Sequence, residues 1–88
     1  MVKIVLSSGW AHRGQTEFDG HAGLLPDVIK GFVARHPDYR RRLLGADGEP
    51  LTYFNIYLDD DLVPRHERAT TTVGAGSTIT ILPPLAGG

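Results

Sequence analysis

The sequence has no cysteine at any of its 88 positions. This absence excludes disulfides, metal sites built on thiolates, and a persulfide carried by the chain itself. An excess of one charge is also missing, because the formal net charge is −1 and charged residues make up 22% of the chain. Bulk electrostatics therefore give no indication of a nucleic-acid or membrane partner.

Long apolar runs are absent as well. No segment reaches transmembrane length, and residues 1–4 lack the apolar core of a signal peptide. We therefore expect a cytoplasmic protein with no membrane span. A chain of this length, 41% of it hydrophobic, fits one domain with a single modest core.

The residues of enzyme active sites do not gather in any motif. The four histidines are scattered without ligand partners at useful spacing, and no triad or carboxylate pair stands out. Residues 59–61 are three aspartates, but their spacing is not that of an EF-hand and favours a polar hairpin turn. Residues 40–42 are three arginines, for which a solvated basic corner is favoured over a nucleic-acid patch, although an acidic partner or a nucleotide stays possible. The histidines are His12, His21, His36 and His66.

Three internal segments have the alternation of half-buried strands. Residues 2–7 place Val2, Ile4 and Leu6 on one face, and residues 15–19 form a weaker strand that makes a hairpin with them. Residues 51–58 are the strongest internal strand. Phe54, Ile56 and Leu58 lie on one of its faces, and Tyr53, Asn55 and Tyr57 lie on the other.

One segment has helical spacing. Pro26 is tolerated only in a first turn and Pro37 disfavours helix at the residue before it, so the helix is expected from about residue 24 to residue 36. Gly31, inside it, is a possible point of close packing on the sheet. A short helical turn is expected at residues 37–44, with Tyr39 and Leu43 inward. The apolar stripe of the main helix is Leu24, Leu25, Val28, Ile29, Phe32 and Val33.

Smaller features complete the core and the sheet. Trp10 lies in the loop after the first strand, where a cap over the end of the core is favoured over a binding anchor. Residues 62–64 read as a short edge segment, to which Pro64 is suited. In the connection that follows, Ala69 and Val73 are possible core contacts.

The last stretch of the chain is the most informative. Residues 78–82 (Thr-Ile-Thr-Ile-Leu) form a strand, and Pro83 and Pro84 end it because they lack backbone donors. From Pro83 to Gly88 an extended chain reaches roughly 20 Å, at about 3.3 Å per residue. The sequence thus predicts a folded domain over residues 1–82 and a flexible tail over residues 83–88, which could enter a partner's cleft.

The order of elements is strand, strand, helix, strand, short edge and strand, which predicts an α+β fold. We expect a mixed sheet with one main helix packed on one face, and with the first and last strands side by side in the middle. This is the ubiquitin-like β-grasp arrangement. It would leave the tail at the end of a central strand.

Two stretches resemble a known family. Residues 54–60 (Phe-Asn-Ile-Tyr-Leu-Asp-Asp) and residues 76–88, which end in Pro-Pro-Leu-Ala-Gly-Gly, are similar to the ubiquitin-like sulfur carriers of the ThiS/MoaD-like family. Within that family the likeness is greatest to the carrier of thiocarboxylate-dependent cysteine biosynthesis. The Trp10 loop matches no feature of the family.

The resemblance implies a carrier and not an enzyme. An activating enzyme that uses ATP would adenylate the Gly88 carboxylate, and a sulfur donor would convert it to a thiocarboxylate for a biosynthetic acceptor enzyme. No cofactor would be bound. Pro83, Pro84, Leu85, Ala86 and Gly87 would thread the partner's channel.

Two other roles stay open. Gly88 could be joined to a lysine of a target, as in a protein modifier, or the chain could be the small subunit of a molybdopterin-synthase-like enzyme. We expect the activating enzyme to dock on the sheet face away from the helix. That face should carry Asn55, Tyr57, Leu82 and neighbouring apolar residues of the last strand.

Overall fold

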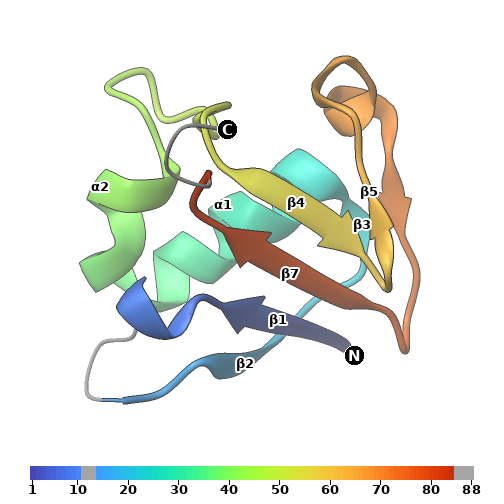
Figure 1. Cartoon of the computed structure of the whole chain (residues 1–88), viewed down its shortest axis with the longest axis horizontal. Coiled ribbons are helices and arrows are strands. Elements are labelled where there is room, and N and C mark those ends of the chain that lie inside the picture. Colours follow the sequence, from blue (N-terminus) through green and yellow to red (C-terminus); the bar gives the residue numbers. More distant parts are fainter. Residues whose placement is uncertain (11–13, 85–88) are drawn as a thin grey trace.

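The computed structural model describes residues 1–10 and 14–84, and in this part of the chain a five-stranded mixed sheet is covered on one face by a helix (Figure 1). The strand order is β2-β1-β7-β4-β5. The predicted β-grasp architecture is confirmed. The strands of this sheet are β1 (Val2–Leu6), β2 (Glu17–Gly20), β4 (Asn55–Leu58), β5 (Asp61–Leu62) and β7 (Thr78–Leu82).

The first and last strands lie side by side in the middle, as the sequence predicted. β1 and β7 are parallel, with Ile4 opposite Ile79 and Leu6 opposite Ile81. The other neighbour of β1 is β2, which runs antiparallel to it, so the predicted hairpin is present. The other neighbour of β7 is β4, also antiparallel. β7 is therefore bonded on both sides along its length.

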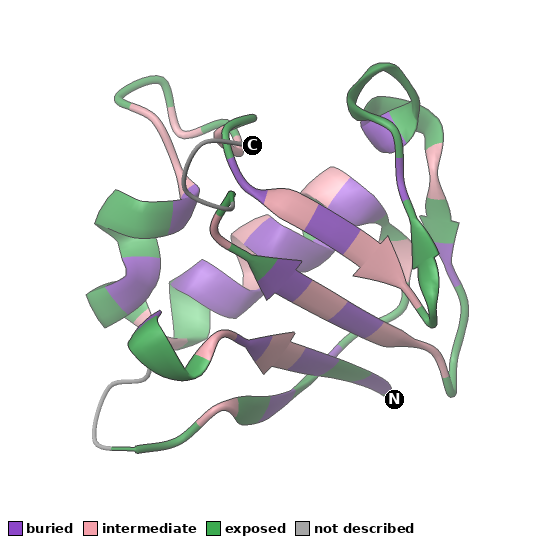
Figure 2. Cartoon of the chain, in the orientation of Figure 1, coloured by how far each residue is buried: buried purple, intermediate pink, exposed green. Residues whose placement is uncertain are grey.

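The main helix, α1 (Leu25–Arg35), packs its apolar stripe against the sheet. Phe32 is fully buried, and its ring makes an edge contact with Phe18 of β2 at 4.9 Å between centroids. Figure 2 shows buried residues alternating with more exposed ones along β7 and β4, which is the pattern of a sheet covered on one side. Leu24 was wrongly assigned to the stripe. It precedes the helix and is exposed, because it lies in the short strand β3 (Gly23–Leu24).

The helical segments after α1 also follow the prediction. The 3₁₀ turn η2 (Pro37–Tyr39) and the short helix α2 (Arg40–Leu43) bury Tyr39 and Leu43. The suggestion that Gly31 allows close packing on the sheet is wrong. A side-chain carbon at that position would meet only the Arg35 guanidinium, at 3.7 Å.

The predicted strand over residues 51–58 is shorter in the structure, where β4 begins at Asn55. The backbone before β4 is bonded by side chains instead of by a strand. Arg65 Nε donates to the Thr52 carbonyl at 2.6 Å, and Arg68 Nη2 donates to the Phe54 carbonyl at 2.6 Å. Both arginines belong to the 3₁₀ helix η3 (Arg65–Thr70).

The η3 segment also corrects a core assignment. Ala69 is exposed, and Arg68 is the buried residue of this turn. Val73 is fully buried, as expected, in the short strand β6 (Thr72–Val73), which pairs with β3 in a separate two-stranded sheet. No helix in residues 1–10 and 14–84 is long and apolar enough to cross a membrane.

Trp10 closes one end of the core, as the favoured interpretation held. It ends the 3₁₀ turn η1 (Ser8–Trp10) and is only 9% exposed. Its ring contacts Phe54 edge-on at 6.1 Å and Tyr53 at 6.2 Å between centroids. The alternative role of an exposed binding anchor is therefore not what the structure shows.

Candidate functional site

The sheet face opposite α1 carries an apolar patch that runs across several strands. Cross-strand register places Leu62 of β5 beside Tyr57 of β4, Tyr57 beside Thr80 of β7, and Thr80 beside Val5 of β1. Leu62 is 53% exposed, and Tyr57 and Val5 are half-buried. Because no described element packs over this side, these groups remain open to a partner (Figure 1).

A second row brings the remaining predicted residues into the same patch. Asn55 of β4 lies opposite Leu82, the last residue of β7, and Leu82 is 36% exposed. The expectation of several apolar residues from the last strand is corrected here. Leu82 is the only one, since the other outward residues of β7 are Thr78 and Thr80. We call Val5, Asn55, Tyr57, Leu62 and Leu82 the open-face patch.

The charged residues of this face lie at its β2 edge. Lys3 of β1 and Glu17 of β2 form an exposed ion pair at 3.2 Å. The apolar groups lie instead toward β4 and β5, around the strand that leads into the tail. The face is thus divided into a polar side and an apolar side, and the apolar side is the one suited to burial in an interface.

The tail leaves the domain from a firmly bonded strand end. Ser7 N–H, just after β1, donates to the Ile81 carbonyl at 3.2 Å, and Asn55 pairs with Leu82 on the other side. Pro83 is half-buried and Pro84 is exposed. The ladder stops here because neither proline has a backbone N–H to donate.

An aromatic and cationic cluster joins the two segments that flank this strand end. Trp10 follows β1 and Tyr53 precedes β4, and their rings are in contact. The guanidinium of Arg42 lies 5.9 Å from the centre of the Trp10 ring, and the Tyr53 hydroxyl donates to the Arg42 carbonyl at 3.2 Å. Sequence reasoning missed this cluster because its members are far apart in the chain. Its effect is to fix the segment after β1 against the segment before β4.

The predicted tail residues Leu85, Ala86, Gly87 and Gly88 lie outside the described residues, as does His12. Their roles stay predictions. In the part of the chain that is described, no group of three or more histidine, aspartate or glutamate side chains is placed to hold a metal. Asp59 forms the expected turn. It has a positive φ of 56°, and its Oδ1 accepts a hydrogen bond from Thr78 N–H at 3.1 Å.

The fold and the open-face patch together define a small ubiquitin-like β-grasp protein. The sequence matches the ThiS family over residues 12–88, and the chain belongs to that family. The family predicted from residues 54–60 and 76–88 is therefore confirmed. A comparison with curated proteins finds no significant match.

Solved structures agree on the fold. The chain is similar to a structure titled as the BexX/CysO complex of Amycolatopsis orientalis, with a TM-score of 0.80, 24% identity and full coverage of both chains. CysO of Mycobacterium tuberculosis matches with a TM-score of 0.79 and 24% identity, over 97% of this chain and 100% of that one. SAMP1 of Haloferax volcanii matches with a TM-score of 0.73 and 24% identity, over 99% and 98% of the two chains.

Proposed function

We propose that this protein is a sulfur carrier whose C-terminal glycine, Gly88, alternates between a carboxylate and a thiocarboxylate. The observation that carries the proposal is the match to the ThiS family, which extends through residue 88. The geometry at the base of the tail supports it. β7 ends at Leu82 beside the open-face patch, so a partner bound to the patch has the tail within its reach.

The proposed chemistry has two steps. The Gly88 carboxylate attacks the α-phosphorus of ATP, which forms an acyl-adenylate and releases pyrophosphate. Hydrosulfide, or a sulfur donor that delivers its equivalent, then attacks the acyl carbon and expels AMP, which leaves a thiocarboxylate. Each step is catalysed by a partner, and this chain supplies the acyl group, the spacer and the docking surface. Glycine suits the terminal position because no Cβ hinders approach to the acyl carbon.

The partners follow from the same two steps. We expect an activating enzyme of the ubiquitin-activating type, a sulfurtransferase or sulfide as donor, and a biosynthetic enzyme that accepts the sulfur. Cysteine, a cofactor or a sulfur-containing natural product are the classes of final product. ATP is used by the activating enzyme and is not bound by this domain. The setting we expect for this cycle is the cytoplasm.

The direct test is intact-protein mass spectrometry. The chain is incubated with its activating enzyme, ATP and sulfide, and we expect a mass increase equal to the exchange of one oxygen for one sulfur. Fragmentation should place the exchange in the peptide that ends at Gly88. The same measurement before incubation establishes the C-terminal residue. A chain that stays unchanged with its own activating enzyme would contradict the proposal.

A protein modifier would give a different result in the same mass-spectrometric measurement. SAMP1, whose fold this chain shares, is titled a small archaeal modifier protein in a second structure. A modifier would yield higher-mass conjugates in which Gly88 is joined to a lysine of another protein. Such conjugates without any thiocarboxylate would favour that role over sulfur transfer. Stable co-purification with a larger chain would instead favour a subunit role.

We propose further that the open-face patch binds the activating enzyme, and this makes a second prediction. The Tyr57→Arg substitution places a charge in the middle of the patch, where Tyr57 has Leu62 and Thr80 as neighbours. Interface hot spots lie near the centre of an interface and are enriched in tyrosine, and the loss of one costs at least about 2 kcal/mol, so we expect adenylation efficiency to fall by roughly 30-fold. The rate of pyrophosphate release, measured as a function of carrier concentration, gives the adenylation efficiency of each variant.

The matched control is Ala34→Arg, which puts the same charge on the exposed side of α1, on the opposite layer of the domain. It should leave adenylation near the wild-type rate. Both variants should have an unchanged melting temperature, because neither site belongs to the buried core. Equal rates for Tyr57→Arg and Ala34→Arg would show that the enzyme docks elsewhere.

A further inference from the structure

A hollow of about 210 Å³ opens on the helix side of the sheet, away from the open-face patch. It lies between the first half of α1, residues 49–52 and η3. A cavity of about 150 Å³ is enough to hold benzene, so this hollow has room for a small molecule slightly larger than benzene. Most of its walls are apolar side chains, namely those of Leu25, Pro26, Ile29, Leu51, Ile56 and Ala69.

Two guanidinium groups, those of Arg65 and Arg68, line the same hollow. Their hydrogen bonds go to neutral backbone carbonyls. Arg65 bonds to Thr52 at 2.6 Å and to Tyr53 at 3.1 Å, and Arg68 bonds to Phe54 at 2.6 Å. Carbonyls satisfy donors but do not neutralise charge, so the hollow holds two positive charges.

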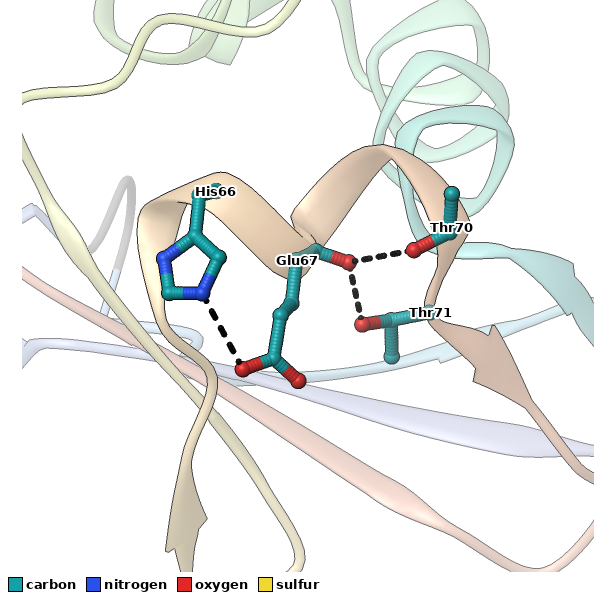
Figure 3. A network of polar contacts seen from close by, with 4 residues as sticks. All are labelled: His66, Glu67, Thr70 and Thr71. Carbon is teal, nitrogen blue, oxygen red and sulfur yellow. Dashed lines mark hydrogen bonds and ion pairs between the residues drawn. The ribbon is translucent and has the colours of Figure 1, made fainter.

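The nearby carboxylates are engaged elsewhere. Glu49 lines the hollow, but its carboxylate is held by Lys30 Nζ at 2.7 Å, and this hydrogen bond raises the pKa of Lys30. The Glu67 side chain points to His66, at 3.4 Å from its Nε2 (Figure 3). Thus, among residues 1–10 and 14–84, no ion pair is formed with Arg65 or Arg68.

The turn that carries the two arginines is fixed by its own bonds. The Glu67 carbonyl accepts hydrogen bonds from the hydroxyls of Thr70 and Thr71, the latter at 2.7 Å (Figure 3). The arginines therefore stay in place without a bound anion. Hydrogen bonding to the carbonyls also orients both guanidiniums, so a ligand would not have to order them.

Arg68 is left with an unused donor. The residue is only 8% exposed, and its Nε is buried with no hydrogen-bond partner among the described residues. Burial, followed by the charge of Arg65, lowers the pKa of the Arg68 guanidinium. A buried donor without a partner is uncommon in folded proteins, so the hydrogen-bonding capacity of the Arg68 guanidinium is not fully satisfied within the domain.

We propose that this hollow is a binding site for a small organic carboxylate with an apolar body. The apolar body would lie against Leu25, Ile29 and Ile56, and the carboxylate would lie beside Arg65 and Arg68, whose positive charges no carboxylate of the described residues neutralises. The fork of a guanidinium can bind a planar carboxylate through two parallel hydrogen bonds, and the apolar walls favour an anion that carries an apolar body. The site is on the opposite side of the sheet from the open-face patch, so this assignment does not depend on the role of Gly88.

Phenylacetate is a suitable probe, with phenylacetamide as the neutral analogue and acetate as the carboxylate without an apolar body. In the full chain labelled with ¹⁵N, the arginine Nε–Hε resonances are followed during titration. We expect saturable shifts at Arg68 and Arg65, and an affinity for phenylacetate at least about tenfold above that for phenylacetamide, as a charge-assisted hydrogen bond provides. Acetate should bind more weakly than phenylacetate by a similar factor.

Two variants test the two halves of the site. Arg65→Gln removes one charge from an exposed residue and should weaken phenylacetate binding about tenfold. Ala69→Phe should fill the hollow and abolish binding while both arginines remain. Arg41→Gln, in the exposed basic corner, is the matched control and should bind as the wild type does.

Several results would overturn the assignment. These are the absence of shifts at Arg68, equal affinity for phenylacetate and phenylacetamide, and shifts confined to residues 40–42. Binding of an acidic peptide in the hollow, without binding of any of the small carboxylates, would also reject it in favour of a protein partner. A saturable response that Ala69→Phe removes and Arg41→Gln retains would establish the site.

Discussion

Deletion of Gly88 is expected to abolish sulfur loading while leaving the domain folded. The deletion moves the terminal carboxylate back along the tail by one residue, about 3.3 Å. Even a misplacement of about 1 Å can cost 100-fold in rate, so we expect a loss of more than about 100-fold in adenylation. The measurement is the rate of pyrophosphate release together with the mass shift in the C-terminal peptide.

A second change tests whether the tail is threaded through a narrow channel. Gly87→Val keeps the length of the tail and adds a branched side chain next to the reacting end, so it should be about as inactive as the deletion. Pro84→Ala is the matched control, since it keeps the length and the small cross-section, and it should retain most of the activity. All three should melt as the wild type does. Normal sulfur loading of the chain without Gly88 would reject the assignment of the reactive group.

Replacing Phe32 with alanine should have the largest effect on stability. Phe32 is fully buried, and its ring contacts those of Phe18, His36 and Tyr39. Removing a buried phenylalanine typically costs about 3–5 kcal/mol. A domain of this size has a free energy of unfolding of roughly 4–13 kcal/mol, so the variant should be close to unfolding at 37 °C. Urea denaturation monitored by circular dichroism gives the change in the free energy of unfolding.

The companion variant Phe32→Leu separates volume from ring contacts. The leucine side chain fills most of the space of the phenylalanine ring, so the free energy of unfolding should fall by only about 1.5 kcal/mol. Because Phe32 is on the opposite side of the sheet from the open-face patch, the folded fraction of Phe32→Leu should be adenylated at the wild-type rate. A strong loss of adenylation in fully folded Phe32→Leu would mean that the core and the docking surface are coupled.

Much of the fold was predictable because its local patterns agree with its final packing. The alternation in residues 2–7 and 78–82 marks two strands, each buried on one face, and Pro26 and Pro37 set the limits of α1 to within about a residue. The role of the tail stays a prediction. It rests on the order of the residues from Pro83 to Gly88, which does not depend on how the domain packs.

The regions that could not be predicted depend on contacts distant in sequence. Residues 51–54 have strand-like composition, yet the carbonyls of residues 52–54 are bonded by Arg65 and Arg68 from η3. Nothing in the local sequence indicates that a guanidinium will be buried, since arginine is usually exposed. The hollow beside η3 could not be foreseen for the same reason. The β3–β6 pair was missed because each of its strands has only two residues.

The pairing of β7 with a parallel neighbour on one side and an antiparallel neighbour on the other has a mechanical consequence. A protein that pulls on the chain at Pro83 applies its force along the axis of β7. The hydrogen bonds to β1 and β4 run across that axis, so they are loaded together in shear instead of opening one after another. Forced unfolding is governed by the barrier to this first rupture. The end of the chain that the proposed partners would hold is thus attached to a strand that resists being pulled out of the domain.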